Sequence, residues 1–160
     1  MNIRKLFINL LLLTILVDSC LLKEEVFVIT FNSALTIPFK IAEVFGKFES
    51  TDFSIKIDIV NKKDFIKFLN LSKYSVVIAD KDTANKLVEL LPNWYRICKV
   101  AEGKNDTYYL LAKKKFILNK KEFSYLIKSW NFGVDELKDP AVLKMMEIKD
   151  LNLKFFHCKG

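Results

Sequence analysis

Three stretches in the first half of the chain have the hydrophobic patterns of β-strands. Val26–Phe31 and Tyr74–Ala79 are almost continuously apolar and rich in β-branched side chains, which is typical of strands buried on both faces of a parallel sheet. Phe53–Val60 instead alternates apolar with polar residues, which indicates a half-exposed strand at the edge of a sheet. The pattern therefore predicts two central strands and one edge strand.

Stretches with helical periodicity separate and follow these strands. The first helix is predicted over Thr36–Phe45, because Pro38 is tolerated in the first turn of a helix and Gly46 is a common stop signal. A second, short helix is predicted after Asn61, and a third helix ends at Pro92. The apolar face of the third helix holds Ala84, Leu87, Val88 and Leu91. Strands and helices that alternate at this spacing predict right-handed βαβ units.

The second half of the chain predicts two strands with no helix between them. Tyr95–Ala101 and Thr107–Ala112 are joined by a short turn-rich segment, which indicates either a hairpin or a crossing within the sheet. Helices are predicted over Lys120–Asn131 and from Asp139 onward, and Leu151–Phe156 could form a last strand. We expect an α/β fold of one lobe, with a mostly parallel sheet and helices on both of its faces.

Residues 1–19 have the pattern of a secretory signal peptide. Basic residues precede an apolar run that ends at Asp18, and this run is shorter than the roughly 20 residues that span a bilayer. The segment Leu16–Cys20 resembles a bacterial lipobox, which implies cleavage before Cys20 and acylation of its thiol. We therefore expect residues 20–160 to form one lobe, lipid-anchored to a membrane at the cell envelope, outside the cytoplasm. The alternative is a plain signal peptide or an uncleaved anchor.

Composition and charge exclude several classes of protein. The chain has 160 residues, of which 51% are hydrophobic, and few glycines and prolines, which indicates one compact domain rather than a disordered chain. Its 26 basic and 19 acidic residues give a net charge of +7, but Arg4 and Arg96 are its only arginines. Base readout and phosphate clamps favour arginine, so we expect no nucleic-acid partner and interpret the lysines as a solvated surface. A mild attraction of these lysines to anionic membranes is compatible with this interpretation.

Little in the sequence predicts catalysis, and we expect neither enzymatic activity nor a cofactor. His157 is the only histidine, and the chain has no nucleophile motif, phosphate-binding loop or dinucleotide-binding glycine pattern. Cys98, His157 and Cys158 do not have the spacing of a metal site, so no metal is expected. Once Cys20 is acylated, Cys98 and Cys158 are the remaining thiols. They could pair as a disulfide outside the cytoplasm or stay as two buried cysteines.

Two polar loops follow predicted central strands and form the candidate ligand site. Asn32 and Ser33 follow the first strand, and Asp80, Asp82 and Thr83 follow the third. In open α/β sheets, ligands bind beyond the carboxyl ends of the strands, where helix N-termini present unpaired N–H groups. These residues are therefore candidates to bind a small polar ligand. The alternative for each of them is a local role as a helix cap.

Four successive segments carry a resemblance to a known family. They are a proline-led helix with a Gly-aromatic end (Thr36–Phe48), an edge strand (Phe53–Val60), a short helix (Asp64–Leu69) and an apolar strand (Tyr74–Asp80). This order resembles the opening of ABC-transporter substrate-binding proteins of the thiamine-precursor and alkylsulfonate type. The resemblance implies a periplasmic-binding-protein-like fold, a small polar ligand and an ABC permease as partner.

The chain departs from this family at two places. Ser75 stands where the family usually has an acidic residue, and Lys113–Lys115 leads almost directly to the closing helices, where the family inserts a second lobe. The resemblance therefore implies a single lobe with an open face, whose small-molecule site needs a second wall from elsewhere. The alternative is an envelope interaction lipoprotein that has lost small-molecule binding and contacts a protein or host partner.

Overall fold

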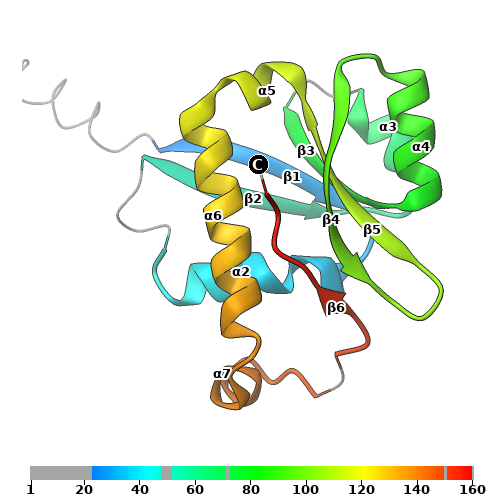
Figure 1. The fold of residues 1–160 in the computed structure, drawn as a ribbon. Coiled ribbons are helices and arrows are strands. Elements are labelled where there is room, and N and C mark those ends of the chain that lie inside the picture. Colours follow the sequence, from blue (N-terminus) through cyan, green and yellow to red (C-terminus); the bar gives the residue numbers. More distant parts are fainter. Residues whose placement is uncertain (1–22, 48–51, 71–72, 150, 160) are drawn as a thin grey trace, which may run out of the picture.

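The computed structural model describes residues 23–47, 52–70, 73–149 and 151–159 (Figure 1). The predicted signal peptide (residues 1–19) and Cys20 lie outside the described residues. Within the described ranges a six-stranded sheet is surrounded by helices. The elements in chain order are β1 (Glu24–Thr30), the 3-10 helix η1 (Ser33–Thr36), α2 (Ile37–Val44), β2 (Phe53–Ile59), α3 (Phe65–Leu69), β3 (Tyr74–Asp80), α4 (Lys81–Leu90), β4 (Trp94–Glu102), β5 (Thr107–Lys113), α5 (Lys114–Leu118), α6 (Lys120–Glu136), α7 (Pro140–Met145) and β6 (Lys154–Phe155).

The sheet is mixed, with the strand order β2-β1-β3-β5-β4-β6. β1 runs parallel to β2 and to β3, as the βαβ pattern of the first half predicts. The pairings of β5 with β3, of β4 with β5 and of β6 with β4 are antiparallel, so the expectation of a mostly parallel sheet is corrected. The reason is the short turn between β4 and β5, since parallel neighbours need a crossover of a dozen or more residues. This turn makes β4 and β5 a hairpin.

Helices cover both faces of the sheet, and each face has its own hydrophobic core. On one face, Val28 of β1 and Ile78 of β3 pack in a cluster with buried residues of α2 and α6. On the other face, Ile29 and Val77 of the same two strands pack with buried residues of α3 and α4. Because side chains alternate along a strand, these central strands need apolar residues at every position. The α/β class, with one lobe and helices on both faces, is confirmed.

The helices α2 and α6 are in close contact over the first core (Figure 1). Gly133 of α6 lies against the backbone of α2, because a Cβ atom at this position would be 1.9 Å from the carbonyl oxygen of Pro38. Beside this contact, the rings of Phe39 and Trp130 pack edge to face with their centroids 5.2 Å apart. The Trp130 indole N–H donates a hydrogen bond of 2.9 Å to the carbonyl oxygen of Phe156. These contacts tie α2, α6 and the C-terminal segment together.

The last third of the chain differs from the sequence pattern in detail. The short helix α5 was not predicted, because it is rich in lysine and only Phe116 among its residues is buried. The helix α6 continues past Asn131 to Glu136, and the last strand is limited to the two residues of β6, which pair with β4. A disulfide joins Cys98 of β4 to Cys158, with 5.6 Å between their Cα atoms. This bond holds the C-terminal segment along β4.

The described hydrophobic core lies entirely after the predicted signal peptide. All members of the buried clusters lie between Val26 and Cys158, so a chain that starts at residue 20 carries the whole described core. Among the helices of the described ranges, none has the length and apolar character needed to cross a membrane. β5 passes directly into α5 and α6, so no second lobe is inserted at this point.

Candidate functional site

Two of the predicted residues lie just beyond the carboxyl end of β1. The Asn32 side-chain oxygen accepts a hydrogen bond of 3.0 Å from the backbone N–H of Ala34 and thereby caps η1. The Asn32 side-chain nitrogen donates a longer hydrogen bond of 3.5 Å to the phenolic oxygen of Tyr108 in β5. Ser33 is exposed, and its carbonyl oxygen accepts a hydrogen bond of 2.7 Å from the Thr36 hydroxyl. Asn32 therefore combines a capping role with a link between β1 and β5.

Asp80 ends β3 and is a buried anion, with 6% of its surface exposed. One carboxylate oxygen accepts a hydrogen bond of 2.8 Å from the backbone N–H of Thr83, which caps α4, and the other forms an ion pair with the Lys62 ammonium. Burial acts to raise the pKa of Asp80, but the hydrogen bonds from Lys62 and Thr83 outweigh burial and hold this pKa below its ordinary value. The hydrogen bond to Asp80 in turn raises the pKa of Lys62, with a further contribution from the negative charge of Asp106. Asp80 and Lys62 therefore carry opposite charges at neutral pH.

Tyr108 of β5 connects the polar residues at the ends of β1 and β3. Asp80 and Tyr108 are directly paired in the antiparallel register of β3 and β5, and Tyr108 also accepts the hydrogen bond from Asn32. The Lys62 ammonium lies 5.1 Å from the centre of the Phe31 ring, just after β1. We call Phe31, Asn32, Lys62, Asp80 and Tyr108 the strand-end cluster. The structure thus brings Asn32 and Asp80 into one cluster at the edge where open α/β sheets bind ligands.

The other predicted residues differ from one another in exposure. Asp82 is exposed in the first turn of α4, where a carboxylate interacts favourably with the helix dipole. Thr83 is buried, and its backbone N–H is bound by Asp80. Capping therefore explains the contacts of Asn32, Asp80 and Thr83. Ser33 and Asp82 supply exposed polar groups beside the strand-end cluster.

Sequence reasoning missed Lys62 and Tyr108. Lys62 follows β2, which is parallel to β1, so the loop after β2 opens at the same edge of the sheet as the loops after β1 and β3. The position of Lys62 directly after a predicted strand could therefore have identified it from the sequence. Tyr108 lies near the start of β5, and it reaches this edge only because β5 pairs with β3 in the antiparallel direction. No local pattern in the sequence indicates that pairing.

The strand-end cluster offers groups that can contact a polar ligand. The Lys62 side chain is 62% exposed, so its ammonium can interact with an acceptor while it pairs with Asp80. Asp106, in the turn between β4 and β5, places a negative charge near this ammonium. The Phe31 ring adds an apolar surface next to the charged groups. This combination suits a small molecule with both polar and apolar parts.

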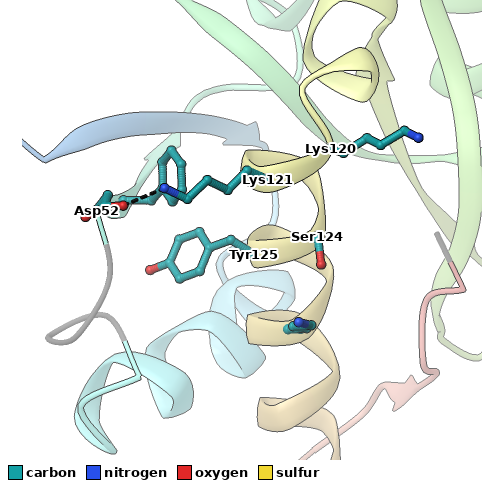
Figure 2. Close-up of a pocket in the computed structure, with 7 residues that line it drawn as sticks. Asp52, Lys120, Lys121, Ser124 and Tyr125 are labelled. Carbon is teal, nitrogen blue, oxygen red and sulfur yellow. Dashed lines mark hydrogen bonds and ion pairs between the residues drawn. The ribbon is translucent and has the colours of Figure 1, made fainter.

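Two open hollows lie at other places on the surface. One, of about 570 Å³, lies between the start of β2 and the helix α6 (Figure 2). Its lining residues are Asp52, Phe53, Lys120, Lys121, Ser124, Tyr125 and Lys128. The other, of about 380 Å³, is lined by Asn93, Lys113, Lys114, Lys115 and Leu118. Neither hollow contains a residue that the sequence singled out as a ligand contact.

The groups that could have indicated catalysis or metal binding are engaged in other contacts. The Nε2 atom of His157 lies 2.9 Å from a carboxylate oxygen of Asp135, and the sulfur atoms of Cys98 and Cys158 form the disulfide. The described part of the chain contains no group of three or more His, Cys, Asp or Glu side chains that could hold a metal ion.

Comparisons with known proteins relate the chain to one fold. No family model and no curated protein matches the sequence. Among solved structures, it is similar to the Candida albicans CA3427 gene product, which is described as defining a new family with the generic periplasmic binding protein structural fold. The TM-score is 0.61 at 8% sequence identity, and the match covers 82% of this chain and 81% of the other. Such a similarity establishes the fold alone. The chain has an α/β fold of the periplasmic-binding-protein type, as a single lobe.

Proposed function

We propose that this chain is a lipid-anchored protein of the cell envelope that binds a small polar ligand at the strand-end cluster. The observation that carries this proposal is the convergence of Asn32, Lys62, Asp80 and Tyr108 from separate segments at the ligand-binding edge of this fold. The lipobox-like segment that ends in Cys20 supports an anchored, extracytoplasmic protein. Delivery of the ligand to an ABC permease is the finer part of the proposal. The proposed role is binding rather than catalysis.

Three residues of the strand-end cluster and the neighbouring Ser33 have distinct roles in this proposal. Asp80 holds the Lys62 ammonium in place, because the carboxylate is itself fixed by the backbone of α4. Lys62 then presents a cation to a carboxylate, sulfonate or other acceptor on the ligand. The Phe31 ring contacts an apolar part of the same molecule. Ser33, which is exposed beside the cluster, supplies a hydroxyl group.

A single lobe is expected to limit the affinity for a small ligand. Good small-molecule sites bury most of the ligand, whereas one lobe supplies only one wall. We therefore infer that a second copy of the chain, a permease or another partner closes the site. Binding to the isolated lobe is expected to be weak.

A ligand panel tests the proposal. Residues 20–160, with Cys20→Ser to remove the free thiol, are analysed by native mass spectrometry and by thermal unfolding with thiamine precursors, sulfonates, amino acids and polyamines. A ligand at one hundred times its dissociation constant stabilises the fold by about 2.7 kcal/mol. We expect a shift that is lost in Lys62→Ala and Ser33→Ala but kept in the matched control Lys86→Ala. No bound mass and no shift with any compound would contradict ligand binding by the lobe.

A protein partner is the second candidate, and a specific observation favours it. Both carboxylate oxygens of Asp80 and the side-chain oxygen of Asn32 already accept hydrogen bonds within the chain. A small ligand would find these acceptors already occupied, whereas a protein partner can contact the exposed side chains of Ser33, Lys62 and Asp82 around them. Site-specific photocrosslinking from position 33 distinguishes the two candidates. A discrete crosslinked protein without a ligand-induced shift supports the interaction lipoprotein, and a ligand-induced shift without a crosslink opposes it.

A further inference from the structure

One corner of the molecule combines lysines with an exposed leucine. It is formed by α5 and the first half of α6, and we call it the basic corner. Its residues are Lys114, Lys115, Leu118, Lys120 and Lys128, all of which are exposed. The two open hollows described above are lined in part by these residues. We propose that the basic corner lies on the bilayer that anchors the chain and binds the headgroups of anionic lipids.

The charges at this corner are predominantly positive. Lys121 forms an ion pair of 2.6 Å with Asp52, so the charge of this acidic residue is already paired. Figure 2 marks this ion pair with a dashed line. Among the described residues, Glu24 and Glu122 are two further acidic groups near the start of α6. Burial raises the pKa of Glu122, and the hydrogen bond and charge of the neighbouring Glu24 carboxylate raise it further. The four exposed lysines of the corner, together with Lys121, outnumber the acidic residues Glu24, Asp52 and Glu122.

Leu118 gives the corner the character of a membrane-interface surface. It is 70% exposed at the end of α5, whereas Phe116 in the same helix is buried and fixes the helix to the core. Lysines stand on both sides of Leu118 in the sequence, at positions 115 and 120. A leucine among lysines can enter the boundary between headgroups and acyl chains while the ammonium groups contact phosphates. This arrangement favours a lipid surface over a soluble anion.

The position of the corner relative to β1 determines what it faces. The Lys121–Asp52 ion pair connects α6 to the start of β2, and the backbone N–H of Glu24 donates a hydrogen bond of 2.8 Å to the carbonyl oxygen of Asp52. Figure 1 accordingly shows the start of α6 beside the first residues of β1. From Glu24 back to Cys20, the chain spans at most about 14 Å even when fully extended. An acylated Cys20 would therefore keep the basic corner close to the bilayer.

This inference rests on the proposed function in one respect, since the predicted anchor at Cys20 defines which end of the molecule is near the membrane. The lipid affinity of the corner can be measured without the anchor. Residues 20–160 with Cys20→Ser are mixed with vesicles of phosphatidylcholine alone or with about 30% phosphatidylglycerol, and binding is measured by sedimentation at low and high salt, because headgroup attraction is screened by salt. The ligand panel concerns other residues, so failure of either proposal is distinguishable from failure of the other.

Two matched sets of substitutions locate the binding surface. The corner variant carries Lys115→Gln, Lys120→Gln and Lys128→Gln. The control variant carries Lys86→Gln, Lys104→Gln and Lys144→Gln, which are exposed lysines of α4, the β4–β5 turn and α7 and give the same net charge. Each lysine near an anionic surface strengthens binding roughly fivefold, so we expect the corner variant to bind about a hundredfold more weakly. The control variant should lose far less. Leu118→Ser should remove a component of binding that persists at high salt.

Several outcomes would overturn the inference. They are a wild-type chain that does not bind the anionic vesicles, equal losses in the two lysine variants, and a Leu118→Ser variant that binds like the wild type at high salt. Equal losses would show that net charge rather than the corner is responsible. Far-ultraviolet circular dichroism and the midpoint of thermal unfolding confirm that each variant is folded. Because all substituted side chains are exposed, little change is expected in either measurement.

Discussion

Replacement of Asp80 tests whether the strand-end cluster rests on a buried anion. Asp80→Ala removes the cap of α4, which contributes about 1 kcal/mol to the free energy of unfolding. It also removes the partner of Lys62, and this pair contributes up to about 1 kcal/mol because the lysine is largely exposed. We therefore expect Asp80→Ala to lower the free energy of unfolding by about 2 kcal/mol at neutral pH. Asp80→Asn keeps a capping oxygen but loses the charge, so its effect should be about half as large.

The lowered pKa of Asp80 determines in which direction the free energy of unfolding changes with pH. The pKa of Asp80 is lowered in the folded chain, so the carboxylate binds its proton more weakly there than in the unfolded chain. Its contribution to stability is therefore complete above the unfolded pKa of about 3.9 and is lost as the pH falls through the lower, folded pKa. The difference between wild type and Asp80→Asn should shrink on acidification. At neutral pH it should not depend on small changes in pH.

Urea unfolding at neutral and acidic pH is the assay, followed by far-ultraviolet circular dichroism. Asp82→Ala is the matched control, because Asp82 is an exposed carboxylate in the same first turn of α4. Its interaction with the helix dipole contributes only about 0.3–1 kcal/mol. The reasoning is refuted if Asp82→Ala destabilises the fold as much as Asp80→Ala does. It is also refuted if the difference between wild type and Asp80→Asn is the same at neutral and acidic pH.

Three further predictions concern the packing of α2 on α6, the disulfide and the proposed lipid anchor. Gly133→Ala should lower the free energy of unfolding by about 3 kcal/mol or more, because its Cβ would overlap the α2 backbone. The control Gly103→Ala should lower it by less than about 1 kcal/mol in the same urea titrations, because the closest atom to its Cβ would be a side-chain carbon of Leu153 at 3.2 Å. Equal losses in these two variants would count against the close α2–α6 contact. The disulfide between Cys98 and Cys158 closes a loop of 60 residues. Substitution of both cysteines with alanine should therefore lower the free energy of unfolding by about 4 kcal/mol. An unchanged melting temperature in this double variant would contradict the prediction. In cells fed labelled palmitate, the full chain should incorporate the label and Cys20→Ser should not, and equal labelling of the two would exclude acylation of Cys20.

The first half of the fold could be predicted because its structure is encoded locally. Val26–Phe31 and Tyr74–Ala79 are apolar at nearly every position, and the structure places them as central strands with a core on each face. The arrangement of the second half depends on contacts between distant residues. β5 lies between β3 and β4, and this place in the sheet cannot be predicted from the hydrophobic periodicity of Thr107–Ala112. The expectation of a mostly parallel sheet therefore does not hold for the second half of the chain, where the strand pairs are antiparallel.

The candidate site shows the same division between local and distant information. Asn32 and Asp80 could be identified because each follows an apolar strand and is a good helix cap. Lys62 and Tyr108 complete the cluster from segments whose position is set by the order and direction of the strands. The sequence could therefore predict the polar ends of β1 and β3. It could not predict how β2 and β5 complete the cluster.

The direction of β1 separates the two proposed surfaces of the molecule. β1 begins at Glu24, close to the basic corner, and leads to Asn32 in the strand-end cluster. At about 3.3 Å per residue, its course from Glu24 to Thr30 covers roughly 20 Å. A short connection to Cys20 would therefore hold the strand-end cluster on the side of the lobe that faces away from the bilayer. In the proposed anchored form, this geometry favours a ligand or partner that arrives from the aqueous space, and the proposed permease would have to reach around the lobe or contact its side.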